Sequence, residues 1–464
     1  MTTRTTILTI ALLLAGSPVA AAGKYHHQTY MRGDFEGTKT CLECHREEAE
    51  QFISSQHYQW EGATPDLANA DGQRLGKMSM INDFCTNPSG HQWIGEVKNA
   101  EGKVLAKGCS SCHAGLGKLP GNEPTDEELE NVDCLICHAS GYRRNLYPTD
   151  EGGWEWRSIL WKNQEGLNSV AKRISAPTRT MCLRCHSASG GGPNYKRGDL
   201  EYVLRDPERS FDVHMAGEGG DLSCADCHGS DDHRVRGHGV DLVASDAPDD
   251  RLSCDGDCHG VTPHEDEDLN RHAVRVDCAS CHIPTFAKED PTDMRRDWSD
   301  VSYSEEKGRH VYSVELASNV VPVYAWHNGE NRSQLPGQPV ERNELGEVIM
   351  AAPIGSRDDP NSKIKPFKLH KGVLPVLDDR QWLVPIGTEE FYAHGDIDRA
   401  VREGAEYYYG MDDIEYSWTE TSRYMGIYHE VVPKEDALKC RDCHGRKSRL
   451  DWEALGYEKD PSND

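Results

Sequence analysis

The sequence is poor in apolar residues: hydrophobic residues fill 36% of its 464 positions, below the usual share for a globular domain. A conventional hydrophobic core built from such a chain would be thin. Basic residues are also in the minority, with 51 Lys and Arg against 78 Asp and Glu and a formal net charge of −27. This acidity argues against nucleic acid or an anionic membrane surface as a partner.

Long apolar runs are missing as well, so the sequence does not predict an integral membrane protein. The apolar run Ile7–Ala15 is too short to span a bilayer, and it lies in a segment where Arg4 is the only charge and Ala20–Ala22 supplies small residues for signal peptidase. We interpret 1–22 as a cleaved secretory signal, with a retained anchor as the alternative, and expect a periplasmic protein. No linker rich in Pro or Ser divides the remainder, so 23–464 is expected to form a single domain.

Cysteine, by contrast, is abundant, and sixteen of the seventeen cysteines fall in one pattern. Seven segments read Cys-x-x-Cys-His, and an eighth has one extra residue between its cysteines. In this pattern two thiols form thioethers with one haem, and the histidine that follows binds its iron. The predicted attachment residues are Cys41, Cys44 and His45; Cys109, Cys112 and His113; Cys134, Cys137 and His138; Cys182, Cys185 and His186; Cys224, Cys227 and His228; Cys254, Cys258 and His259; Cys278, Cys281 and His282; and Cys440, Cys443 and His444.

Other interpretations of paired cysteines are weaker. A zinc ribbon or a redox-active dithiol also uses Cys-x-x-Cys, but here a histidine follows the second cysteine every time. For Cys254 and Cys258 the alternative is a disulfide, which would leave His259 without a role. Gly256 would let the longer loop bulge, so the sequence predicts eight covalently bound haem c groups.

Eight porphyrins would replace the apolar side chains that the sequence lacks. We therefore predict a multihaem c-type cytochrome fold, mainly α-helical with long loops and little β-structure, with a core of eight packed haems. Attachment sites are dense in 41–282 and absent from 300–437, and the last lies at 440–444. The haem-free interval, which includes strand-like runs and a candidate helix at Ile397–Met411, is expected to supply axial ligands and to close the substrate or partner face.

Distal ligands decide which haems can react. A haem with histidine on both faces is closed and suits electron transfer, whereas catalysis needs an open or exchangeable position. Fourteen histidines remain after the motifs, so their number alone does not show whether one haem is exceptional. His26 and His27, next to the predicted cleavage site, are poor candidates. The better candidates, each of which could also be a surface residue or a propionate partner, are His57, His214, His233, His264, His272, His370 and His429.

One cysteine, Cys85, lies outside the motifs. An odd cysteine in an exported protein is a free thiol or forms an intermolecular bridge. It would be either a small buried apolar residue or a thiolate that attacks a sulfur–sulfur bond beside a haem.

Beyond the motifs, most of the mature sequence resembles the octahaem tetrathionate reductase family. The resemblance implies that the second haem, held by Cys109 and Cys112, is the active one. It also implies a lysine amine, Lys196, on the distal side of this haem, with Cys85 and Asn82 close by. One departure is a longer insert at Thr86–Lys107. The similar segments include Ile81–Cys85, Glu130–Leu135, Gly190–Gly192, Lys196–Asp199, Asp212–Met215 and Pro433–Glu435.

The resemblance implies a periplasmic reductase that passes electrons through bis-histidine haems to the lysine-ligated haem and reduces a small sulfur oxyanion, tetrathionate, to thiosulfate. Its partners would be this anion, or a small nitrogen compound, and a periplasmic or membrane-bound electron donor. Two alternatives stay open. Reduction of nitrite or hydroxylamine is one, although no attachment motif ends in lysine and no single tyrosine can be identified as a haem crosslink. A carrier with all eight haems closed by histidine is the other.

Overall fold

The computed structural model describes residues 26–84, 107–237, 244–247 and 249–463, together with 93, 94, 98, 102, 104, 105, 239 and 241. The predicted signal at 1–22 and the cysteine at 85 therefore lie outside the described residues. None of the helices in the described part of the chain combines the length and apolar character needed to cross a bilayer.

Helices or single helical turns carry the attachment motifs. One α-helical turn places positions i, i+3 and i+4 on the same face, so both cysteines and the histidine of a motif project together. Cys134–His138 forms α5 and Cys278–His282 forms α10, whose first turn is capped by the Asp277 side chain. The motif with the extra residue, Cys254–His259, accommodates it in a π-helical turn, Asp255–His259, because such a turn holds more residues than an α-helical one.

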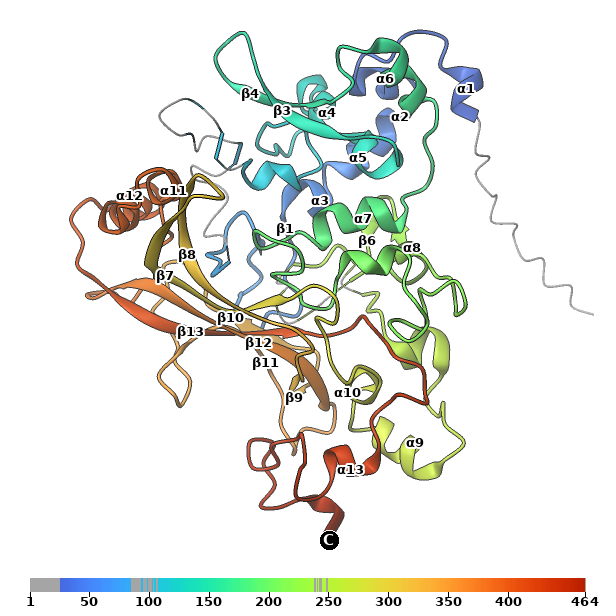
Figure 1. Ribbon diagram of the computed structural model, residues 1–464, viewed down its shortest axis with the longest axis vertical. Helices are drawn as coiled ribbons and strands as arrows, with labels where there is room; N and C mark the ends of the chain where they lie inside the picture. Colours follow the sequence, from blue (N-terminus) through green and yellow to red (C-terminus); the bar gives the residue numbers. More distant parts are fainter. Residues whose placement is uncertain are drawn as a thin grey trace, which may run out of the picture.

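The remaining elements complete the layout in Figure 1. The other helices are α1 (His26–Tyr30), α2 (Thr38–Phe52), α3 (Gln56–Gln59), α4 (Asp126–Asn131), α6 (Gln164–Ala171), α7 (Arg179–His186), α8 (Cys224–Cys227), α9 (Glu267–Ala273), α11 (Thr388–His394), α12 (Ile397–Tyr409) and α13 (Cys440–Cys443). The strands are β1 (Glu61–Gly62), β2 (Leu75–Gly76), β3 (Arg144–Pro148), β4 (Trp154–Ser158), β5 (Ser230–Asp231), β6 (Arg234–Val235), β7 (Thr292–Ser304), β8 (Arg309–Ala317), β9 (Val323–His327), β10 (Asn331–Ser333), β11 (Val348–Pro353), β12 (Lys363–Leu377) and β13 (Tyr416–Gly426).

A seven-stranded mixed sheet dominates the second half of the described chain. Its order is β10-β11-β13-β12-β7-β8, with β9 paired to β12. Strands β12 and β13 are antiparallel from the pair Phe367–Gly426 to the pair Leu377–Tyr416, and β12 runs parallel to β7. In Figure 1 the sheet lies to one side of the short helices that carry the motifs.

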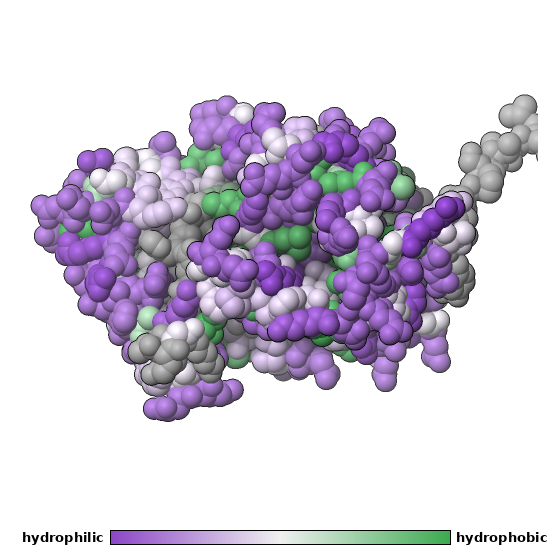
Figure 2. All heavy atoms as spheres, turned by 90° about the horizontal axis from the view of Figure 1, so that it is seen from above, coloured by the Kyte–Doolittle hydropathy of each residue, from purple (hydrophilic) through white to green (hydrophobic). Residues whose placement is uncertain are grey.

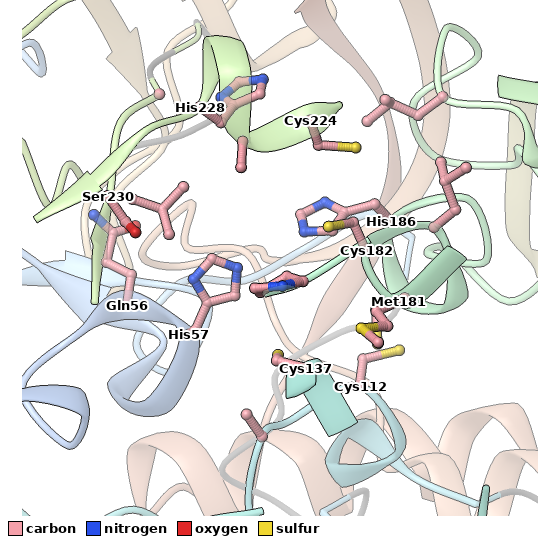
Figure 3. Close-up of a pocket in the computed structure, with 18 of the residues that line it drawn as sticks. Gln56, His57, Cys112, Cys137, Met181, Cys182, His186, Cys224, His228 and Ser230 are labelled. Carbon is pink, nitrogen blue, oxygen red and sulfur yellow. The ribbon is translucent and has the colours of Figure 1, made fainter. Parts of the chain in front are cut away.

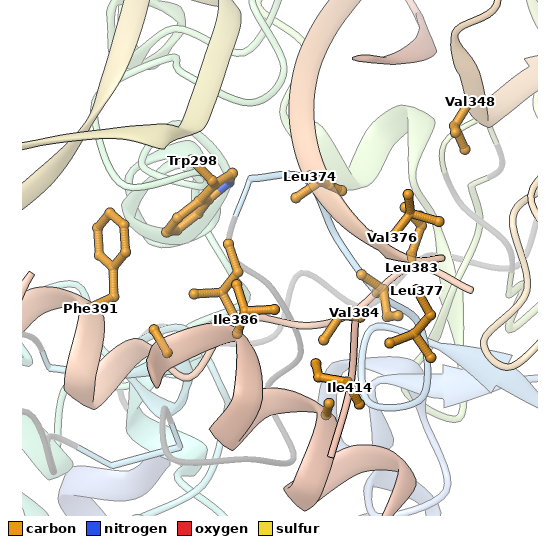
Figure 4. Packing of buried hydrophobic residues seen from close by; sticks show 14 of the residues in the cluster. Trp298, Val348, Leu374, Val376, Leu377, Leu383, Val384, Ile386, Phe391 and Ile414 are labelled. Atoms are coloured by element: carbon orange, nitrogen blue, oxygen red, sulfur yellow. The ribbon is translucent and has the colours of Figure 1, made fainter. Parts of the chain in front are cut away.

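The prediction of a mainly α-helical fold with little β-structure is wrong. It relied on a composition averaged over the whole chain, whereas the sheet has an apolar core of its own. Figure 4 shows this core, in which Trp298, Leu374 and Val376 of the sheet pack with Phe391 of α11 and with Ile414. Because these side chains bury one another, the strands of this region do not depend on haem for a hydrophobic face.

The surface reflects the acidic composition. The face seen in Figure 2 is mostly hydrophilic, and apolar side chains show in its recesses.

Candidate functional site

In seven of the eight motifs, the histidine ring faces a second histidine ring from another part of the chain. An imidazole nitrogen binds a metal at about 2 Å, so rings on opposite sides of one iron have centroids about 6 Å apart. The centroid distances are 5.9 Å for His27–His45 and His214–His259, 6.1 Å for His57–His186, His228–His429 and His272–His444, 6.3 Å for His264–His282 and 6.4 Å for His138–His233. Each pair leaves room for one iron atom.

Hydrogen bonds orient several of these rings. When Nδ1–H donates to a carbonyl or carboxylate oxygen, the tautomer is fixed and Nε2 is left for a metal. The donor–acceptor pairs are His138 to the Ser175 carbonyl (3.0 Å), His228 to the Arg236 carbonyl (2.8 Å), His272 to the Asp268 carbonyl (2.7 Å), His429 to the Asp199 carboxylate (3.1 Å) and His444 to the Asp460 carboxylate (2.7 Å).

A cavity of about 2920 Å³ connects most of the motifs. Ligand pockets usually measure about 300–1,000 Å³, so this cavity suits several large groups rather than one. Cysteines from seven of the motifs line it, the exception being the last motif. Figure 3 shows His57 and His186 pointing into this space, close to cysteines of several motifs. Thiol pairs, facing imidazoles and an apolar cavity of this size together fit covalently bound haems.

Contacts between cysteines of different motifs show which sites are neighbours. We number the sites 1 to 8 in the chain order of their motifs. The contacts link site 1 to 3, 3 to 4, 4 to 2, 4 to 5, and then 5 through 8 in order. The thiols that lie close enough to shift each other's pKa strongly are Cys41–Cys134, Cys112–Cys185, Cys182–Cys224 and Cys254–Cys278, and weaker electrostatic interactions join Cys137–Cys185, Cys227–Cys258 and Cys281–Cys443.

Site 2 differs from the other seven. The ring contacts of His113, among the described residues, are with Tyr58, Trp60 and Trp93 at 4.8–5.7 Å and not with another histidine. His113 is fully buried, its Nε2 lies 2.6 Å from the Tyr58 carbonyl, and its Nδ1 has no hydrogen-bond partner. Nε2 is thus taken by a backbone carbonyl, and Nδ1 is buried beside Gly115. Unlike the histidines of six other motifs, His113 does not line the cavity, and no described imidazole faces its ring.

Lys196 lies on a loop that lines the same cavity as Cys109, Cys112 and Asn82. The loop folds back on itself through backbone hydrogen bonds. The backbone N–H of Asn194 donates to the Ser187 carbonyl at 2.6 Å, and the backbone N–H of Lys196 donates to the Ser189 carbonyl at 3.1 Å. Gly190 has φ +89°, and a Cβ there would lie 2.9 Å from the backbone nitrogen of Lys196. Glycine is therefore required where the loop packs against Lys196.

The other candidate residues take different positions. Six of the seven predicted distal histidines face a motif histidine, whereas His370 stacks on Phe84 at 4.1 Å and donates from Nδ1 to Asp83 at 2.8 Å. His27, a poor candidate from its position in the sequence, faces His45. Asn82 accepts a hydrogen bond from the Phe84 amide at 2.8 Å and shapes the local turn. No local signal distinguishes His27 from His370, because the partner of each, His45 for His27 and Asp83 for His370, is brought to it by the fold.

Sequence reasoning also missed Arg144 on β3, which holds the backbone of motif 2. Its guanidinium donates to the carbonyls of Ser110, Ser111 and His113 at 2.6–3.2 Å. It also pairs with the Asp133 carboxylate at 2.8 Å, and the two side chains are 6% and 3% exposed. This planar group with five donors satisfies several acceptors at once, so it fixes the turn from which Cys112 and His113 project.

We expect the substitution Arg144→Gln to lower the free energy of unfolding by about 3–5 kcal/mol, because it leaves the Asp133 carboxylate buried and unpaired. Denaturant titration of the haem-loaded protein measures this change. The control is Arg143→Gln at the exposed neighbouring position, for which the same titration should change little. Equal stability of the two variants would contradict the role assigned to Arg144.

Comparisons with known proteins support the interpretation that the chain binds haem c. Residues 282–447 match the family model described as "Cytochrome c bacterial". An uncharacterised protein of Archaeoglobus fulgidus is 32% identical over 238 residues, which cover 45% of this chain and 77% of the relative. The crystal structure of an octahaem cytochrome c from Shewanella oneidensis superposes with a TM-score of 0.75 at 30% identity, covering 94% of this chain and 98% of that one.

Proposed function

Because this chain belongs to the octahaem c-type cytochromes, we propose that its electron-transfer role is that of a periplasmic reductase with its active haem at site 2. The observation that carries the proposal is the asymmetry of the histidine pairs: seven motif histidines face another histidine, and His113 does not. The seven haems with histidine on both faces would conduct electrons, and the haem of site 2 would react.

At site 2 the distal ligand would be the amine of Lys196. Haem c bound there supplies electrons and a coordination position that an exchangeable ligand can vacate. The loop contacts described above place the lysine backbone in one conformation, and its side chain lines the cavity beside the second motif's cysteines. An amine must be neutral to act as a ligand, because its lone pair forms the bond to the metal.

The proposed substrate is tetrathionate, a dianion. Two electrons break its central sulfur–sulfur bond and release two thiosulfate ions, with no proton taken up. Basic side chains of the cavity would offset the acidity of the whole protein. Lys77 interacts electrostatically with Cys112, and Lys107 stands two residues before Cys109 in the same lining.

Cys85 enters the proposal from the sequence alone. Its thiolate would attack one central sulfur, release the first thiosulfate and carry the remaining sulfur and sulfonate as a mixed disulfide. Two electrons delivered to that sulfur–sulfur bond would release the second thiosulfate and restore the thiolate. The electrons come from a periplasmic or membrane-bound donor.

Spectroscopy and turnover together test the proposal. Low-temperature magnetic resonance of the oxidised protein should show seven bis-histidine haems and one haem with a different ligand set. Turnover with tetrathionate, measured as thiosulfate formed, should exceed turnover with nitrite or hydroxylamine at the same reductant concentration. Eight bis-histidine signals would make the protein an electron carrier, and preferential turnover of a nitrogen compound would replace the proposed substrate.

A further inference from the structure

A buried arginine of the haem-free region contacts both segments that approach site 2. Arg296 on β7 is fully buried. Its Nη1 donates to the Phe84 carbonyl, and its Nη2 donates to the Gly190 carbonyl at 2.7 Å. Phe84 lies two residues after Asn82, and Gly190 belongs to the loop that carries Lys196. One guanidinium therefore joins two stretches of chain that belong to no helix or strand.

The surroundings of Arg296 hold the guanidinium in one orientation. The Asp293 carboxylate accepts from its Nε at 2.9 Å and lies 2.6 Å from its Nη2. The guanidinium also stacks over the rings of Tyr312 at 4.2 Å and Phe84 at 5.1 Å. A buried ion pair of this kind adds little net stability compared with apolar residues, so stability alone does not account for the arrangement.

A second buried cation acts on the same loop from the neighbouring strand. Lys368 on β12 donates from Nζ to the carbonyls of Tyr195 and Lys196 at 2.7 and 2.9 Å, and to the Thr292 hydroxyl at 2.6 Å. It is 1% exposed. The loop is thus held at Gly190 from β7 and at Lys196 from β12, so the sheet is the rigid support for the distal side of site 2.

We propose that Arg296 is a positioning residue that fixes the Lys196 loop relative to the 82–84 segment and so sets the distal side of site 2. This inference rests on the proposed function, because it assumes that Lys196 serves that haem. It explains why a haem-free region is folded as a sheet against the haem-binding part: its buried donors reach carbonyl groups that the irregular loops leave unpaired. Arginine suits the task because its planar fork reaches two carbonyls and a carboxylate together, which a lysine ammonium cannot do in the same geometry.

The test uses the full-length, haem-loaded protein with Arg296→Lys and Arg296→Gln. Both variants lose the forked geometry, although only the glutamine removes the charge. In both we expect the magnetic-resonance signal of the site 2 haem to shift or split into several populations. Turnover should fall about 10- to 100-fold, the usual cost of removing an outer support of a metal site. The signals of the seven bis-histidine haems should stay unchanged.

The matched control is Arg295→Gln. Arg295 is the preceding residue on β7, is 29% exposed and pairs with Glu420 at 2.9 Å, so the substitution removes the same charge from the same strand. It should leave the site 2 signal and turnover unaltered. Unaltered site 2 signal and turnover in the Arg296 variants would overturn the inference, and so would the joint loss of all eight haem signals, which indicates a role in the whole fold. Eight bis-histidine signals in the unsubstituted protein would instead overturn the proposed function.

Discussion

Replacing Lys196 with methionine should abolish reduction of tetrathionate while leaving seven haems unaltered. Methionine keeps much of the length and apolar stem of lysine but carries a thioether, which itself binds haem iron in cytochromes c, in place of the amine that is vacated for substrate. Loss of an outer support around a metal costs about 10- to 100-fold, and we expect loss of a direct ligand to reduce turnover by more than about 100-fold. The measurements are thiosulfate production and the magnetic-resonance signal of the site 2 haem.

The control for this substitution is Lys307→Met, in the exposed turn between β7 and β8. It removes one positive charge that does not line the cavity and should change neither turnover nor the spectrum. If Lys196→Met kept the site 2 signal of the unsubstituted protein, another group would occupy the distal position, and the active haem would have to be assigned again.

Local chemistry explains which parts of the site could be read from the sequence. The cysteines and histidine of each motif fall within one helical turn, so their pattern alone identifies a haem attachment site. Distal ligands are different, because a pair such as His228–His429 is joined only by the fold. His27 was judged a poor candidate from its position beside the predicted cleavage site, and position in the sequence does not record which ring faces a motif histidine.

The sheet was missed for a related physical reason. The low overall apolar content led to the prediction that haems replace part of the core, but it concealed a region that buries its own side chains. Trp298, Val376 and Phe391 lie in that region, and they pack with one another across the sheet and α11. The buried cations Arg296 and Lys368 could not be recognised in the sequence either, because their partners are backbone carbonyls of distant loops.

Removing the haem of site 4 should stop electron supply to site 2. Of the site 4 cysteines, Cys185 interacts with the cysteines of sites 2 and 3, and Cys182 interacts with a cysteine of site 5. Site 4 therefore joins the arm formed by sites 1 and 3 to the arm formed by sites 5 to 8. The double substitution Cys182→Ala and Cys185→Ala prevents attachment of this haem.

The donor in this experiment should be a reduced electron-transfer protein too large to enter the cavity. Turnover should then fall to the rate at which the reduced donor reacts with tetrathionate when this protein is absent. The optical response of the site 2 haem to added tetrathionate should persist. Two comparison variants each lack the haem at the end of one arm. Cys41→Ala with Cys44→Ala removes the haem of site 1, and Cys440→Ala with Cys443→Ala removes the haem of site 8.

At least one end variant should retain turnover, because the donor needs only the arm that it contacts, whereas both arms reach site 2 through site 4. Full turnover without the site 4 haem would mean that electrons reach His113 and its haem by a route outside the cysteine contacts. Loss of the optical response to tetrathionate would mean that site 4 supports the fold of site 2 rather than its electron supply. Conduction is thus separated from binding by one pair of measurements on one variant.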